Sequence, residues 1–197
     1  MRTIGILLFD DVEVLDFAGP FEVFGVARTD DDPPQRLFQV VTVAETARPV
    51  QARNGLSINP HHTLATCPPL DLLLVPGGQG TRREIHNPVL VDWIKARAAQ
   101  VDLLLSVCTG SFLLAKASLL DGLKATTYHT TFDTLAELAP TATLCPGERF
   151  VDNGHLIMSA GISAGIDMSL YVVGKLHGDA QATRTARHME YEYWPRT

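Results

Sequence analysis

The sequence predicts an α/β fold in which a mainly parallel sheet is covered by helices on both faces. Its first support is a set of four apolar runs of strand length, at residues 3–9, 37–44, 70–78 and 101–108. Continuous apolar runs are typical of strands buried on both faces, whereas a half-exposed strand alternates. Helical patterns lie between the runs, and strands that alternate with helices favour a parallel order.

The helical segments are marked by apolar spacing and by the residues that begin them. Phe17, Phe21 and Phe24 recur at helical spacing, and Pro20 is expected in the first turn of that helix. Three further helices are predicted at 87–100, 110–120 and 162–177. The first of these opens with an Asn-Pro pair, which predicts a capping side chain followed by a proline at the first helical position.

Two segments predict hairpins or additions at the edge of the sheet. Residues 48–60 and 142–160 alternate in polarity and turn at Asn-Gly pairs. Residues 30–35, DDDPPQ, predict a polar surface loop. With neither a repeat nor a long linker, residues 1–197 are expected to form a single domain.

Composition narrows the function classes. The formal net charge of −6 disfavours a nucleic-acid partner, which requires a basic face, and leaves a small-molecule substrate open. The N-terminal region predicts neither a signal peptide nor a membrane segment. The three cysteines are far apart and form no CxxC pair, so neither a disulfide framework nor a zinc site is expected, and a cytoplasmic location fits. His61-His62 lacks a second ligand pair, so no metal and no other cofactor is expected.

The candidate site follows from where the predicted strands end. In open α/β sheets, ligands bind outside the carboxyl ends of the strands. Asp16 lies in the segment after the first strand, Gly77-Gly78 follow the third, and Cys108 follows the fourth. A carboxyl group, a glycine pair and a thiol are therefore expected at one edge of the sheet.

Each of these residues has a chemical reason to be there and a simpler alternative. A helix N-terminus after Cys108 favours its thiolate, and Gly77-Gly78 can bring bare N–H groups to developing negative charge. Asp16 can stay protonated beside a thiolate and donate that proton. The alternatives are a cysteine that only fills the core, glycines that only turn the chain, and an aspartate that only caps a helix. Cys67 and Cys145 are expected to be structural.

Four segments together resemble the ThiJ/PfpI superfamily, over nearly the whole chain and in order. They are LLFDDVEVLDFAGPFEVF, LDLLLVPGGQGT, SVCTGSFLLAKASLLDGLKATTYH and GHLIMSAGISAGIDMSLYVV. The resemblance implies a class I glutamine amidotransferase-like, flavodoxin-like three-layer sandwich. LDFAGP, SVCTGS and AGISAGID most resemble the isocyanide hydratase branch. The same signature occurs in the N-terminal domain of AraC-type regulators, whose helix-turn-helix domain has no room in this sequence.

The resemblance assigns roles residue by residue. Cys108 matches the nucleophile and Asp16 the acid that contacts its sulfur. Gly77 and Gly78 match the glycine pair beside the nucleophile. Thr109 stands where PfpI-type proteases carry a histidine, which counts against a cysteine protease of that type. The resemblance implies a homodimer, and it implies no cofactor.

One motif departs from the pattern that the resemblance predicts. ATTYH at 125–129 replaces the expected ATTHW, so Tyr128 stands at the usual His position and His129 at the usual Trp position. Motif position predicts a substrate pocket formed by Thr126, Tyr128, His129 and Ile162. The departure leaves the substrate open.

Three hypotheses follow. The first is an isocyanide hydratase-like hydro-lyase that converts an isocyanide and water into an N-substituted formamide, with Cys108 as nucleophile and Asp16 as acid. The second is another cysteine enzyme of the superfamily, a glyoxalase, an aldehyde-directed hydratase or an amidase. The third is a domain without catalytic activity, in which Cys108 senses oxidants or the pocket binds an effector.

Overall fold

Four parallel strands form the centre of the sheet, where the apolar runs predict them. They are β1, β2, β6 and β7, at Arg2–Leu8, Phe38–Ala44, Leu72–Val75 and Leu103–Val107. The computed structural model describes residues 1–192. Strands β6 and β7 are buried along their whole length, as continuous apolar runs require. Both end before the predicted runs do, because 76–78 and Cys108 leave the sheet as loops.

Three short strands complete a seven-stranded sheet with the order β10-β11-β7-β6-β1-β2-β5. They are β5, β10 and β11, at His62–Thr63, Phe150–Asp152 and Leu156–Ser159. Within residues 1–192, β10 is the one strand of this sheet that runs antiparallel to its neighbour, across the predicted Asn-Gly turn. The sheet is therefore mainly parallel with an antiparallel edge, and this confirms the predicted fold class.

The other predicted hairpin, at residues 48–60, lies outside the main sheet. Strands β3 (Val50–Gln51) and β4 (Ser57–Ile58) pair antiparallel around a short 3-10 turn at Arg53–Gly55. Strands β8 (Lys124–Ala125) and β9 (Thr143–Leu144) form a further small parallel pair.

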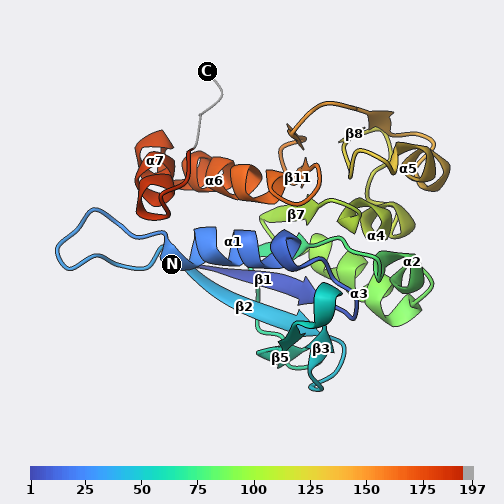
Figure 1. Cartoon of the computed structure of the whole chain (residues 1–197), viewed down its shortest axis with the longest axis horizontal. Coiled ribbons are helices and arrows are strands. Elements are labelled where there is room, and N and C mark those ends of the chain that lie inside the picture. The colour runs from blue at the N-terminus through green and yellow to red at the C-terminus, as the bar shows by residue number, and fades with distance from the viewer. Residues whose placement is uncertain (193–197) are drawn as a thin grey trace.

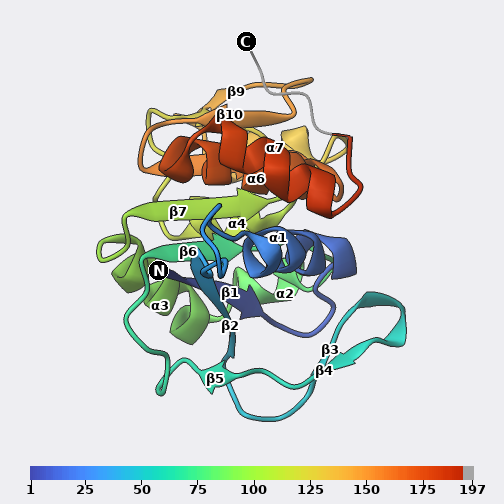
Figure 2. The ribbon, with the colours of Figure 1, turned by 90° about the vertical axis from the view of Figure 1, so that its left-hand side faces the viewer.

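Helices cover both faces of the sheet (Figures 1 and 2). Helices α1, α6 and α7 pack against one another on one face, at Val14–Val26, Ala164–His177 and Asp179–His188. Helices α2, α3 and α4 cover the other, at Thr81–Glu84, Pro88–Ala98 and Gly110–Lys116, with α5 (Phe132–Leu138) against α4. Among residues 1–192, no helix combines the length and the apolar character needed to cross a bilayer.

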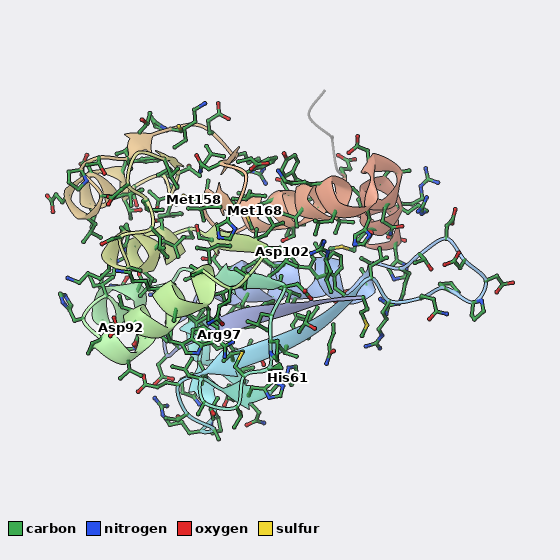
Figure 3. All side chains as sticks on the ribbon, turned by 180° about the vertical axis from the view of Figure 1, so that it is seen from behind. His61, Asp92, Arg97, Asp102, Met158 and Met168 are labelled. Carbon is green, nitrogen blue, oxygen red and sulfur yellow. The ribbon has the colours of Figure 1, made fainter. Side chains whose placement is uncertain are left out.

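Helix α6 packs closely on strands β7 and β11, next to Cys108. Met158 of β11 and Met168 of α6 are fully buried where that helix covers the sheet (Figure 3). A Cβ added at Gly165 of α6 would lie 3.0 Å from the Val107 side chain, so a small residue is needed for this approach. Helix α6 thereby sits directly on the end of β7, one residue before the cysteine.

Pro20 does not begin its helix, and the prediction was wrong on this point. Helix α1 starts at Val14, and Pro20 lies inside it. Asp11 has φ 61°, so the chain turns immediately after β1 and the helix forms earlier than the phenylalanine spacing indicates. Proline has no N–H, so the helical hydrogen bond to the carbonyl of Asp16 is absent at this turn.

The cap of α3 gives a stability test. Asn87 Oδ1 accepts hydrogen bonds from the N–H groups of Val89 (3.1 Å) and Leu90 (3.4 Å). We expect Asn87→Ala to lower the free energy of unfolding by about 1 kcal/mol, because two helical donors lose their acceptor. Urea denaturation measures this loss. Asn87→Ser retains a capping oxygen and should recover most of it. Asn59→Ala, at an exposed position, is the matched control, and equal losses in both alanine variants would contradict the role of the cap.

Candidate active site

Cys108 occupies a strained turn between a strand and a helix. Strand β7 ends at Val107, helix α4 begins at Gly110, and Cys108 has φ 57°, a left-handed conformation that costs a non-glycine residue about 1 kcal/mol or more. The Cys108 N–H donates to the carbonyls of Ser159 (3.1 Å), the last residue of the neighbouring strand β11, and of Ala160 (3.2 Å), which follows it. The residue is 6 % exposed, so Cys108 is almost fully enclosed.

Asp16 brings three distant parts of the chain together. It is fully buried in the first turn of α1, and it is hydrogen-bonded to the Cys108 thiol. Its Oδ2 accepts from the Gly77 N–H at 3.0 Å, and its Oδ1 accepts from the Ile162 N–H at 3.1 Å. Ile162 has φ 59°, a second strained residue, and this conformation aims its N–H at the carboxyl group. The predicted Asp16–Cys108 pair is therefore assembled, with both carboxyl oxygens held.

Position 77 has no room for a side chain, so it requires glycine. A Cβ added there would lie 2.5 Å from Thr109 N, 2.8 Å from Asp16 Oδ2 and 2.8 Å from Cys108 Cβ. These distances are shorter than van der Waals contact, and the first involves backbone. Any other residue at 77 would separate the carboxyl from the thiol.

The glycine N–H groups differ from the prediction of two bare donors. Gly77 N–H is used by Asp16, and Gly78 N–H donates to Thr109 Oγ1 at 3.1 Å. The Thr81 hydroxyl also bonds to Thr109 Oγ1 at 3.1 Å, which fixes that side chain. The Thr109 backbone N–H, in contrast, donates to the Cys108 sulfur. The N–H that donates to the Cys108 sulfur is thus that of Thr109. The N–H groups of Gly77 and Gly78 instead hold the side chains of Asp16 and Thr109.

Burial and charge set how the pair holds its protons. Burial raises the pKa of Asp16 to about 7, although the hydrogen bonds from Gly77, Ile162 and Cys108 oppose this rise. Burial also raises the pKa of Cys108, and the negative charge of Asp16 raises it further. The Thr109 N–H lowers the pKa of the thiol but does not reverse the shift. The two groups therefore resist joint ionisation, and the thiolate is favoured when Asp16 keeps its proton.

A pocket of about 190 Å³ opens beside the sulfur. Its lining combines the turn at Cys108 with residues from five other segments: Glu13, Arg53, Gly78, Gln79, Arg82, Cys108, Thr109, Tyr128 and Ile162. Asp16 does not line it. The pocket is therefore a small chamber with polar and charged residues in its lining and Cys108 in its wall.

Of the predicted pocket residues, Tyr128 and Ile162 line this pocket and the other two do not. The Tyr128 ring packs against Gly161, so the ring is fixed at the wall. His129 is exposed and its ring lies 4.3 Å from that of Tyr128, centroid to centroid, on the outside. Thr126 is fully buried, and its hydroxyl donates to the Glu148 carbonyl (3.2 Å).

Four lining residues are absent from the predicted set: Glu13, Arg53, Gln79 and Arg82. Glu13 and Gln79 neighbour predicted elements, and their positions after a strand are a usable signal. Arg53 comes from the β3–β4 hairpin, and no local pattern ties that hairpin to the strand edge.

The remaining cysteines lie elsewhere. Cys67 is buried beside the Pro68 carbonyl, and Cys145 is partly exposed near strand β9. All three cysteines are free thiols. Within residues 1–192, no three His, Cys, Asp or Glu side chains gather in a way that could hold a metal ion.

Comparison with known proteins finds similarity to an enzyme and to transcriptional regulators. It is 38% identical to the isonitrile hydratase of Pseudomonas putida over 95% of this chain and 78% of that protein. It is 29% identical to the transcriptional regulator GbdR of Pseudomonas aeruginosa over 97% of this chain. The chain spans about half the length of that regulator, 51%.

A solved structure and a family model also match the chain. A ThiJ/PfpI family protein from Pseudomonas syringae superposes with a TM-score of 0.87 and 31% identity, over 100% of this chain and 77% of that one. The family model matches residues 2–175. The central sheet, the turn that carries Cys108 and these matches together establish that the chain belongs to the DJ-1/PfpI family.

Proposed function

We propose that the protein is an isonitrile hydratase-like enzyme, which adds water to an isonitrile and releases an N-substituted formamide. The observation that carries the proposal is the hydrogen-bonded Asp16–Cys108 pair, whose cysteine lines the pocket. The 38% identity to an isonitrile hydratase supports the same reaction.

The first step uses the pair as nucleophile and acid. The Cys108 thiolate forms a bond to the terminal carbon of the isonitrile, and the proton on Asp16 moves to that carbon. The product is a thioimidate linked to the sulfur, and Asp16 is left as a carboxylate. The Gly77 and Ile162 N–H groups stabilise this carboxylate, because each donates to one of its oxygens.

The second step consumes water. Water adds to the thioimidate carbon, one of its protons goes to nitrogen and the other returns to Asp16. The carbon–sulfur bond then breaks, which releases the formamide and restores the thiolate. The Thr109 N–H stabilises the sulfur as it regains negative charge.

A turnover assay tests the reaction. Wild-type protein should convert an aryl isonitrile to its formamide, as measured by loss of the isonitrile infrared band and by chromatography. Cys108→Ala should abolish turnover, and Asp16→Asn should lower kcat by about 100-fold, because the proton donor is lost. Cys145→Ala is the matched control and should retain wild-type rates. Absence of formamide across several aryl and alkyl isonitriles would refute the proposal.

The shared proton predicts a pH profile for thiol reactivity. With Asp16 near pKa 7, the pair loses its first proton around neutrality, and the remaining proton can sit on either group. Alkylation of Cys108 by iodoacetamide should rise by about tenfold between about pH 6 and about pH 8 and then level. In Asp16→Asn the rate should keep rising above this range, because only the thiol itself then titrates. Mass spectrometry of the Cys108 peptide measures both, and a wild-type profile without levelling would contradict the shared proton.

A second candidate function is effector binding. The 29% identity to a transcriptional regulator over 97% of the chain favours it, since that protein shares the domain. In this case the pocket would bind a small molecule without consuming it. Wild type and Cys108→Ala would bind the same isonitrile or formamide equally in calorimetry, with no chemical change. Turnover that depends on Cys108 decides against this candidate.

A further inference from the structure

The pocket beside Cys108 carries two arginines, Arg53 and Arg82, on its wall. Glu13 is the one acidic side chain among the lining residues. The wall is therefore cationic in sum, although the protein as a whole carries a formal charge of −6.

Arg53 is the cation without a partner. It is half-buried, and within residues 1–192 its guanidinium makes no hydrogen bond and no ion pair within 4 Å. Arginines nearby behave differently: Arg48 pairs with Asp10, and Arg83 pairs with Asp11 and Glu84. A partly buried guanidinium that lacks a counter-charge and faces a pocket favours binding of an anion there.

The backbone around Arg53 is fixed, so its position on the wall is defined. The Arg53 N–H donates to the Val12 carbonyl at 2.9 Å, and the Asp11 N–H donates to the Gln51 carbonyl at 2.7 Å. Asn54 follows in a left-handed conformation, φ 62°, which turns the hairpin back directly after Arg53. The hairpin thus docks on the segment that leads into α1 and Asp16.

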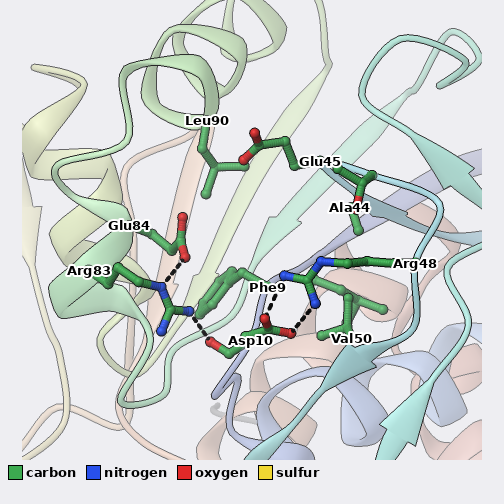
Figure 4. Close-up of a pocket in the computed structure, with 11 residues that line it drawn as sticks. Phe9, Asp10, Ala44, Glu45, Arg48, Val50, Arg83, Glu84 and Leu90 are labelled. Atoms are coloured by element: carbon green, nitrogen blue, oxygen red, sulfur yellow. Dashed lines mark hydrogen bonds and ion pairs between the residues drawn. The ribbon is translucent and has the colours of Figure 1, made fainter.

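A charged cluster fastens this hairpin from the other side (Figure 4). Asp10 Oδ1 accepts from the Gln51 N–H at 2.9 Å, and Asp10 Oδ2 accepts from the Arg48 guanidinium at 2.6 Å. Arg83 donates to the Asp10 carbonyl at 2.8 Å. The charges of this cluster, which borders a cavity of about 160 Å³, are satisfied internally. It holds the segment that presents Arg53.

Arg82 is the second arginine of the pocket wall, and its position is fixed by two contacts. Its guanidinium donates to the Gly78 carbonyl at 3.1 Å and lies 5.3 Å from the centroid of the Phe112 ring. This places a second positive charge next to the glycine pair. Cys108 and both arginines therefore line one pocket.

We propose that the pocket is specific for small substrates that carry a carboxylate, and that Arg53 is the residue that binds this group, with Arg82 beside it. The proposal deepens the proposed function and rests on it for the reaction. The binding of the anion is independent of that reaction, because it depends only on the wall of the pocket. For an isonitrile hydratase-like enzyme, the substrate class is then an isonitrile that bears a carboxylate.

The first experiment measures anion preference without any isonitrile. Iodoacetate and iodoacetamide have nearly the same size and both form a carbon–sulfur bond with the thiolate as iodide leaves, but only the former is anionic. Mass spectrometry of the Cys108 peptide measures the rate of alkylation by each reagent at about pH 8. At this pH the Asp16–Cys108 pair has lost its first proton. Arg53→Gln should lower the iodoacetate-to-iodoacetamide rate ratio by about tenfold, and Arg53→Lys should retain part of the preference.

A matched control removes an arginine elsewhere. Arg187→Gln, at an exposed position on helix α7, changes the net charge equally and should leave the ratio unchanged. An equal ratio in wild type and Arg53→Gln, or an equal fall in Arg187→Gln, would overturn the proposal.

The second experiment uses the proposed reaction. Wild type should show a higher kcat/KM for 4-isocyanobenzoate than for 4-isocyanobenzamide, and Arg53→Gln should remove this difference mainly through KM. If neither isonitrile reacts, the proposed hydratase activity is refuted. The ratio of the two alkylation rates then still tests whether Arg53 binds an anion. Turnover with no preference that depends on Arg53 refutes the anion site and leaves the hydratase standing.

Discussion

The structure depends on one buried carboxyl group. Asp16 has no contact with water, and its two oxygens take hydrogen bonds from Gly77 and Ile162. A buried carboxylate is costly unless each oxygen is satisfied, so three segments must meet at this point for the group to be tolerated. The same requirement places the Cys108 thiol against the carboxyl and ties its ionisation to that of its neighbour. Fold and chemistry are thus set by the same contact.

The sheet could be predicted from the sequence because strands buried on both faces leave a continuous apolar pattern. The site edge could be predicted as well, since Asp16, Gly77 and Cys108 follow strands that are neighbours in a parallel sheet. Ile162 could be assigned to the pocket from its motif. Its role in holding Asp16 could not, because that role belongs to a backbone N–H aimed by a left-handed residue. Such a group has no signature in the side-chain sequence.

The predictions that failed did so for physical reasons that act over distance. Gly77 and Gly78 were expected to present free N–H groups, but the buried Asp16 and Thr109 oxygens need donors and take them. His129 and Thr126 were expected in the pocket wall from their positions in the ATTYH motif. Of the residues in this motif, Tyr128 lines the pocket and these two do not. Arg53 lies 55 residues before Cys108 in the chain, on a hairpin with no pattern that relates it to the strand edge. Only the docking of that hairpin brings it to the pocket.

The β3–β4 hairpin has a consequence for how such proteins diversify. It pairs with itself outside the main sheet, so its side chains can change while the strands that hold Cys108 and Asp16 stay the same. Under the proposed anion site, a substitution of Arg53 on the hairpin changes what the chamber binds and leaves Asp16 and Cys108 in place. The proposed selectivity and the proposed reactivity then lie on separate pieces of the chain.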